Sequence, residues 1–275
     1  MTDDNYDLMG TIPSVPSALN PDSSQSITLM VALKNPRSLL TTVKDTSTQL
    51  PLSGATVNLS KSGYDTSLIT GQGFLSQTDW SYGPDQEDFI NPSKFFSSDG
   101  NIEYSYQGEL RLKKSWNRYV YSGSLVSSTL DLGSGVNFQQ VLWQPQNQPS
   151  RTGQDSVKFQ IATNNNKQDW NFLGPDGTEN SFYTLSNYEI SSIHSGDRYL
   201  RYKVFLSTEN NRYTPSVSDV QITFTSSCVP PGQVMFSGLD YGYYSLSVSK
   251  SGYSTYNGWI YISSNWQSQE ININP

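Results

Sequence analysis

The chain has 275 residues, a formal net charge of −7 at pH 7 and one cysteine, Cys228. The acidic balance argues against binding of nucleic acid through a broad basic patch, and a single cysteine excludes any disulfide within the chain. Aromatic residues make up 13% of the sequence and charged residues only 15%, a balance that favours β-sheet over long helices.

Residues 1–37 contain one clear strand pattern, at residues 26–33, which reads SITLMVAL. We expect this segment to be the last strand of a preceding domain or a β-rich linker. The chain begins Met1-Thr2-Asp3-Asp4 and lacks the basic start of a secretory signal. The sequence therefore predicts either a protein that is not exported by that route or, as we favour, a piece of a longer chain. No apolar run approaches the ~20 residues that a membrane span needs.

Residues 38–81 begin with two strand patterns that are separated by a turn. The strands are expected at residues 39–44 (LLTTVK) and 55–60 (ATVNLS), and the turn between them contains the sequence PLSG. Proline and glycine supply the fixed and the permissive backbone angles that such a turn requires. The pentapeptide SKSGY follows at residues 60–64.

Residues 82–227 carry a second series of short stretches broken by Gly, Pro, Asn, Asp and Ser, the pattern of an all-β sandwich. Alternation is clearest at residues 156–163, 199–207 and 219–225, where apolar and polar side chains take opposite faces of a strand. We expect little helix, at most a turn at residues 92–96.

Residues 228–275 supply strands that the opening segment lacks. Strand patterns occur at residues 243–250 and 259–263, and SKSGY recurs at residues 249–253. We predict that residues 38–81 and 228–275 are two halves of one seven-stranded sandwich, and that each SKSGY copy is a hairpin turn. The intervening residues 82–227 are then an insertion, whose ends lie close together if its first and last strands pair in one sheet.

The two halves together resemble a known family. The opening segment, with its PLSGA turn, and the closing sequence GQVMFSGLDYGYYSLSV at residues 232–248 resemble carboxypeptidase regulatory-like and CnaB-like domains. CnaB-like domains often hold an internal isopeptide bond. The positions that match the family's lysine and glutamate are Val43 and Val248 here, so the resemblance implies the regulatory-like variant without that bond.

The insertion resembles a jelly-roll module of bacterial surface proteins and secreted enzymes. Three sequences carry this resemblance: SGSLVSSTLDLG at residues 122–133, GDRYLRYKVFLST at residues 196–208 and TPSVSDVQI at residues 214–222. The expected fold class is therefore all-β, an Ig/transthyretin-like β-sandwich with an inserted jelly-roll β-sandwich. The arrangement resembles parts of prepilin-like surface proteins of uncultured bacteria, although their N-terminal pilin helix does not occur in this sequence.

The sequence offers little for catalysis. A Ser-His-Asp triad could use only His194, the sole histidine, and no G-x-S-x-G elbow accompanies it. We interpret His194 as a turn residue. One Cys and one His cannot supply a zinc or iron cluster, and most carboxylates lie in turn contexts rather than in the paired arrangement of a glycosidase. We therefore expect a protein that is not an enzyme.

Calcium is the cofactor for which the sequence offers the best ligands, because Ca²⁺ takes carboxylate, amide and carbonyl oxygens from loops. Neither acidic loop of the insertion follows EF-hand spacing, and solvated loops are the favoured interpretation. Aromatic rings of the insertion could stack on sugars, with core packing as the simpler alternative. The candidate calcium ligands are Asp85, Glu87, Asp88, Asp176 and Glu179, and the candidate sugar platforms are Trp116, Trp143, Trp170 and Tyr183.

These features predict a non-enzymatic, extracellular, structural or adhesive module of a pilin-like or stalk-like bacterial surface protein. The expected partners are other cell-surface or pilus subunits, which the insertion would meet while the sandwich acts as scaffold. The alternative is a carbohydrate-binding adhesin that acts through the jelly-roll insertion. The sequence leaves open whether Cys228 pairs with another chain.

Overall fold

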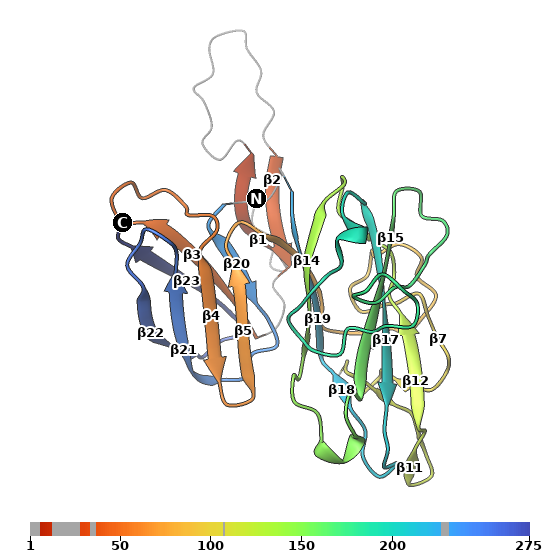
Figure 1. The fold of residues 1–275 in the computed structure, drawn as a ribbon. Helices are drawn as coiled ribbons and strands as arrows, with labels where there is room; N and C mark the ends of the chain where they lie inside the picture. The colour runs from red at the N-terminus through yellow and green to blue at the C-terminus, as the bar shows by residue number, and fades with distance from the viewer. Residues whose placement is uncertain (1–5, 13–27, 34–36, 107, 227–230) are drawn as a thin grey trace. The chain divides into compact units, whose positions relative to one another are not determined.

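The structure is a computed structural model, and it describes residues 6–12, 28–33, 37–106, 108–226 and 231–275. Among these residues the regular structure is strand, apart from two single 3-10 turns, so the predicted all-β sandwich class is confirmed (Figure 1). The described residues contain no helix that is long and apolar enough to cross a membrane.

The chain divides into two compact units. The first is made from Met1–Gly73 and Thr225–Pro275, and the second from Phe74–Phe224. The division therefore lies before residue 81, where the sequence placed the end of the first half. The physical reason is that β6 (Gly73–Gln77) joins the sheet of the second unit and Trp80 is part of its core.

The first unit contains a sandwich of two sheets whose inner faces are apolar. Along residues 56–61 and 242–249 buried positions alternate with more exposed ones, as a sheet with one wet face requires. The inner side chains include Leu59, Leu246 and Ile262, each at most 1% exposed. The three-stranded sheet has the order β20 (Gln233–Phe236), β3 (Ser38–Asp45), β23 (Trp266–Ile273), and the four-stranded sheet has the order β22 (Tyr256–Ile262), β21 (Gly242–Ser249), β4 (Thr56–Lys61), β5 (Tyr64–Ile69).

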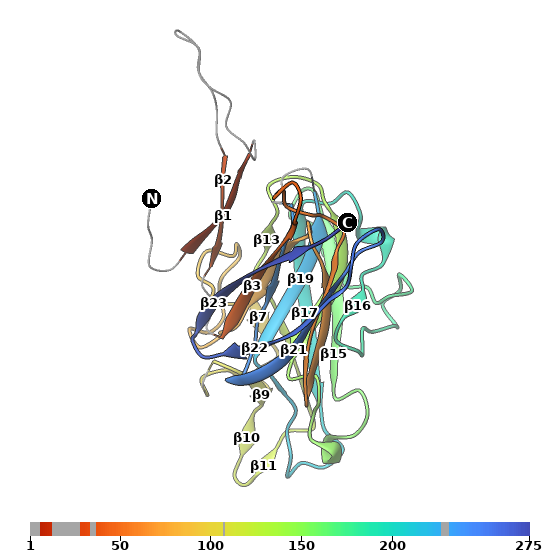
Figure 2. The same cartoon turned by 90° about the vertical axis from the view of Figure 1, so that its left-hand side faces the viewer.

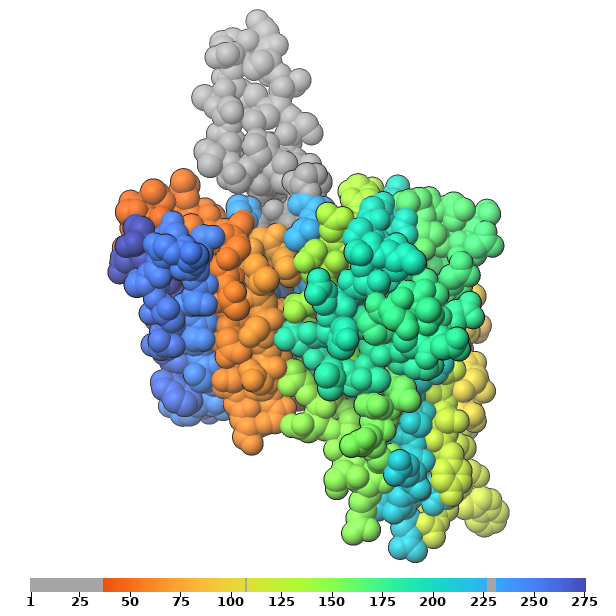
Figure 3. Space-filling model, in the orientation of Figure 1, coloured from red at the N-terminus to blue at the C-terminus, as the bar shows by residue number. Residues whose placement is uncertain are grey.

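Both sheets combine strands from the two distant parts of the sequence. In one sheet β3 lies between β20 and β23, and in the other β4 pairs with β21. In the space-filling view residues 37–73 and 231–275 form one continuous body, orange and blue in Figure 3. Neither segment could close its sheets alone, which explains why each looked incomplete in the sequence.

Both SKSGY copies are hairpin turns, as predicted. The first joins β4 to β5, with Lys61 opposite Tyr64, and the second joins β21 to β22. In each copy the glycine, Gly63 or Gly252, has a φ of +84°. This left-handed conformation favours glycine, which explains why the same short sequence serves both turns.

A tyrosine fixes the entry to β21. The Tyr244 hydroxyl accepts a hydrogen bond from the backbone N–H of Asp240 at 2.9 Å and donates to the Asp240 carbonyl at 3.1 Å. Such a tyrosine corner is a feature of Greek-key sandwiches. Val43 and Val248, the positions compared with the isopeptide residues, are both fully buried.

The second unit packs several sheets around one large apolar core. Its first and last strands, β6 and β19, are neighbours in one sheet, and this pairing brings the ends of the unit together. β6 lies before the insertion that the sequence placed at residues 82–227. The first of its two larger sheets contains β13 (Leu130–Asp131), β17 (Tyr199–Ser207), β12 (Ser122–Val126), β7 (Ser97–Ser98) and β15 (Val157–Asn164), and the second contains β16 (Tyr188–Glu189), β14 (Asn137–Gln144), β19 (Asp219–Thr225) and β6. Smaller sheets are formed by β18 (Ser216–Val217), β9 (Leu110–Leu112) and β8 (Ile102–Glu103), and by β10 (Lys114–Ser115) and β11 (Arg118–Tyr119).

The core of the second unit also holds a polar network. Trp80 Nε1 donates to the Tyr202 hydroxyl at 3.0 Å, and that hydroxyl donates to Gln77 Oε1 at 2.5 Å. The Gln77 amide in turn donates to three backbone carbonyls. Because all of these groups are satisfied, the network joins β6 to β17 inside an otherwise apolar core.

The segment before the sandwich is a hairpin. β1 (Tyr6–Ile12) pairs antiparallel with β2 (Thr28–Leu33), and β2 coincides with the strand expected at residues 26–33. The expected turn at residues 92–96 is part of an irregular loop, in which the Lys94 N–H donates to the Asn91 carbonyl. Cys228 lies outside the described residues.

Candidate functional site

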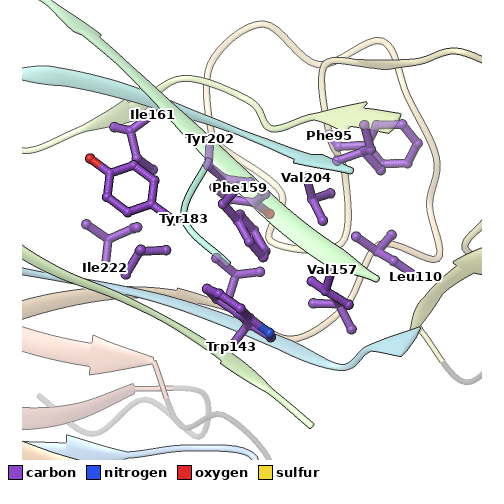
Figure 4. Close-up of a cluster of buried hydrophobic side chains, with 14 of the residues drawn as sticks. Phe95, Leu110, Trp143, Val157, Phe159, Ile161, Tyr183, Tyr202, Val204 and Ile222 are labelled. Carbon is purple, nitrogen blue, oxygen red and sulfur yellow. The ribbon is translucent and has the colours of Figure 1, made fainter. Parts of the chain in front are cut away.

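Two of the four candidate sugar platforms are core residues. Trp143 is 3% exposed and Tyr183 is fully buried, and the Trp143 ring stacks on Phe159 with centroids 4.8 Å apart (Figure 4). A ring that is enclosed by other side chains has no free face for a sugar. The structure therefore favours core packing for these two residues, the simpler of the two interpretations.

Trp170 and Glu87 meet at a buried arginine. The Arg201 guanidinium lies between two rings, 4.0 Å from the centroid of Phe96 and 4.6 Å from that of Trp170. It donates through Nε to the Thr129 hydroxyl at 2.9 Å and through a terminal nitrogen to Glu87. Burial lowers the pKa of Arg201, and the charge of Glu87 opposes that effect. One face of the Trp170 ring is therefore already in contact with a cation of the same chain, the Arg201 guanidinium.

Asp88 is part of a similar arrangement on the same sheet. It accepts a hydrogen bond from Lys167 Nζ at 2.7 Å, and that ammonium lies 5.0 Å from the ring centroid of Tyr199. The Arg198 guanidinium also lies over the Tyr199 ring, and it donates hydrogen bonds to both carboxylate oxygens of Asp131, at 2.7 and 2.8 Å. Cations and rings therefore alternate beside the start of β17, and the carboxylates balance the cations.

The remaining candidate calcium ligands do not join this arrangement. Asp85 is an exposed turn residue with a φ of +71°, and Glu179 is exposed. Asp176 accepts hydrogen bonds from the N–H and hydroxyl of Thr178, each at 2.8 Å, and from Ser181, whose hydroxyl is the main cause of its lowered pKa. Within the described ranges no three His, Cys, Asp or Glu side chains gather as they would around a metal ion.

His194 lies inside the second unit and not at its surface. Its Nδ1 is 3.0 Å from the Thr163 hydroxyl, and that hydroxyl donates to Asp197 Oδ2 at 2.6 Å. In a catalytic triad the imidazole lies between the hydroxyl and the carboxylate, whereas here the hydroxyl lies between the other two groups. This geometry does not fit a catalytic triad, and the contact with Thr163 gives His194 a structural role at the end of β15.

Trp116 is the most exposed aromatic residue of the second unit. It lies at the apex of the β10–β11 hairpin, where the turn places Ser115 opposite Arg118. Its side chain is 100% exposed, and its φ of +56° is unusual for a bulky residue. Trp116 is the candidate sugar platform whose two ring faces are both free.

The pairing of the central strand β3 with the edge strand β23 is the feature that the sequence pattern did not reveal. The two strands are parallel over the full length of each, from Ser38 opposite Trp266 to Asp45 opposite Ile273 (Figures 1 and 2). Two further backbone bonds extend the ladder, from the Ser38 N–H to the Asn265 carbonyl at 2.9 Å and from the Thr46 N–H to the Ile273 carbonyl at 3.1 Å. Lys44 forms an ion pair with Glu270 across the two strands.

Comparisons of the chain with models of protein families, with curated proteins and with solved structures found no match. The geometry described above is therefore the basis for a functional assignment.

Proposed function

We propose that the chain is a non-enzymatic structural and adhesive module of a pilin-like or stalk-like bacterial surface protein, in which the first unit carries tension. The observation that carries this proposal is the parallel pair β3–β23. The seven strands and the tyrosine corner of the first unit support its likeness to carboxypeptidase regulatory-like sandwiches. Its location would be the cell surface and its partners other surface or pilus subunits.

The direction of the two strands determines how they respond to force. Tension would enter at the start of β3, Ser38, and leave at the end of β23, Ile273, which lie at opposite ends of the ladder. The strands would then be pulled along their own axes in opposite directions. Because the bonds of a parallel ladder are evenly spaced along this axis, they share the load and must break together.

The inserted unit lies outside this load path. It leaves the first unit after β5 and returns before β20, and these two places are joined by a hydrogen bond from the Gly71 N–H to the Gln233 carbonyl at 3.3 Å. As long as the ladder holds, tension passes from β3 to β23 directly. The second unit can therefore keep its binding loops folded while the stalk is under load.

Single-molecule pulling tests the proposal. Handles at residues 37 and 275 load β3–β23 in shear, whereas handles at Arg37→Cys and Asn265→Cys, with Cys228→Ser, separate the same two strands from one end. We expect a higher rupture force in the first geometry, and unfolding of Phe74–Phe224 only after that rupture, since forced unfolding is controlled by the unfolding rate. Equal forces in the two geometries, or release of the second unit first, would contradict a load-bearing role.

The second candidate is an adhesin that binds carbohydrate through the inserted unit. The full exposure of Trp116 favours it, because both faces of the ring could meet a ligand. A Trp116→Asn variant keeps a residue that tolerates the left-handed turn. Glycan binding that this variant loses would support the adhesin.

A further inference from the structure

The outward face of the sheet β22–β21–β4–β5 carries a cluster of exposed aromatic rings. Along β21 and β22, residues that point inward are buried, such as Leu246 and Ile260. The residues between them point outward, and three of these are Tyr243, Trp259 and Tyr261, with exposures of 68%, 73% and 50%. Large aromatic side chains are costly to leave in water, so three of them on one strand pair mark a binding surface.

The register of the strands places these rings side by side. Tyr243 lies directly opposite Tyr261, with ring centroids 4.7 Å apart. Trp259 is two residues before Tyr261 on the same strand, so the two side chains emerge from the same face about 6.6 Å apart. Trp259 in turn lies opposite Ser245 on β21. The three rings thus cover a continuous area over two adjacent strands.

Apart from Ile69, the rest of this face is polar and almost without charge. All four strands lie within the described residues, and their outward positions hold one ionised side chain, Asp65 on β5. Asn58 Nδ2 donates to Asp65 and to the Ser67 hydroxyl, at 2.8 and 3.0 Å. The other outward positions of the four strands are Thr56, Ser60, Ile69, Ser245, Ser247, Ser249 and Asn257.

We propose that this face binds an extended, neutral β-linked polysaccharide, whose sugars stack on Tyr243, Trp259 and Tyr261. A pyranose ring has an apolar C–H face and a rim of hydroxyl groups. Aromatic rings match the first, and serine and asparagine side chains match the second. The nearly uncharged surface complements a neutral polymer rather than an anionic one. The site is independent of the proposed load-bearing role.

A protein partner fits this surface less well. The core of a protein interface is apolar with a polar rim, whereas here small hydroxyl side chains lie directly beside the rings along β21 and β4. An extended polymer of flat sugars needs a shallow strip that alternates between apolar and hydrogen-bonding groups. Strand pleating supplies such a strip without a cleft.

Binding of the full chain to insoluble cellulose, chitin and β-1,3-glucan tests the proposal, followed by calorimetric titration with the soluble hexasaccharide of whichever polymer is bound. Trp259→Thr removes the most exposed of the three rings and keeps a residue suited to a strand. Tyr243→Ser with Tyr261→Thr is the second variant. Tyr82→Ser, which removes a ring of similar exposure (70%) from the other unit, is the matched control. Circular dichroism and thermal melts verify that each variant is folded.

We expect the wild type to bind at least one polymer with little dependence on salt. Trp259→Thr should weaken binding by roughly tenfold or more, as expected for loss of an aromatic anchor, and Tyr82→Ser should leave it unchanged. Absence of binding to all three polymers would overturn the proposal. So would binding that only Trp116→Asn abolishes, preference for the anionic polymer heparin, or a dimer that Trp259→Thr dissociates.

Discussion

At the scale of single residues, the buried His194 makes stability depend on pH. The side chain is 2% exposed, and its Nε2 has no hydrogen-bond partner among the described residues. The Thr163 hydroxyl gives its proton to Asp197, so the imidazole donates through Nδ1 and is neutral. Burial lowers the pKa of His194 to about 4, although the nearby charge of Asp197 acts in the opposite direction.

The consequence of this shift can be measured by unfolding. Below pH 6.5 the unfolded histidine takes up a proton that the folded one refuses until about pH 4. The unfolding free energy of the second unit is therefore highest above pH 6.5, and it decreases by about 3 kcal/mol between pH 6.5 and pH 4. Urea unfolding between pH 7.5 and 4 should show this loss, and His194→Asn should flatten the slope. An unchanged slope in the variant would assign the pH dependence to other groups.

The first unit should respond to acid in a different range. Asp45 accepts hydrogen bonds from Ser47, Thr48 and Tyr253, and these lower its pKa to about 2. A carboxylate whose pKa is lowered by folding stabilises the fold at any pH above its unfolded pKa of 3.8. This stabilisation is lost as the pH falls toward the folded pKa of about 2. The pH dependence between 6.5 and 4 thus belongs to the second unit.

At the scale of elements, the alternation of apolar and polar residues determined which strands the sequence could predict. The strand expected at residues 199–207 coincides with β17, because every second residue from Leu200 to Leu206 is apolar and lies on one face. The two-residue strands between β7 and β11 have no such pattern. Parallel pairing of β3 with β23 is a long-range contact that neither strand encodes alone.

The same signal explains the outcome for the site residues. Trp143 follows Val141 and Leu142 in a run of β14 that has apolar residues on both faces of the strand. The sequence alone therefore does not determine whether the Trp143 side chain points inward or outward. Trp259 and Tyr261 alternate with Ile260 and Ile262, and the structure exposes the rings and buries the isoleucines. The partners of Glu87 and Asp88 come from distant segments, which no local pattern reveals.

The seam where the chain returns to the first unit is a tight element contact. Just before β20, Gly232 has a φ of +75°, and its carbonyl accepts a hydrogen bond from Val43 of β3. A Cβ at this position would lie 2.6 Å from Pro51 Cβ and 2.8 Å from the Val43 carbonyl oxygen. Gly232→Ala should therefore destabilise the first unit by roughly 2–4 kcal/mol, from backbone strain and overpacking together.

A matched control separates the two causes. Gly252 has a similar φ of +84°, but a Cβ there would have no neighbour within 4 Å. Gly252→Ala should cost only about 1 kcal/mol, the conformational part. Urea unfolding of both variants measures the difference. If the two variants lose equal stability, the close contact with Pro51 has no energetic role.

At the scale of the whole molecule, the first unit should not need the second one to fold. All seven strands of its sandwich lie outside residues 74–224, and the Gly71–Gln233 hydrogen bond holds the two connections together. Replacing residues 74–224 by a short Gly-Ser linker should give a folded sandwich. Its unfolding free energy should match that of the first unit in the intact chain, because a folded insertion keeps its own ends close.

Unfolding the insertion instead of removing it should have a different effect. Trp80→Ala deletes a fully buried ring and its bond to Tyr202, a change that costs the second unit several kcal/mol. The first unit would then have to close a long flexible loop. Each doubling of loop length costs about 0.6 kcal/mol, and the unfolded residues 74–224 are about four doublings longer than a linker of roughly ten residues. We therefore expect the first unit to lose roughly 2 kcal/mol of its unfolding free energy under conditions where the second unit is unfolded. Hydrogen exchange of the β3 and β21 amides measures this loss directly. A sandwich that loses its structure whenever the second unit unfolds would show that the two units fold as one.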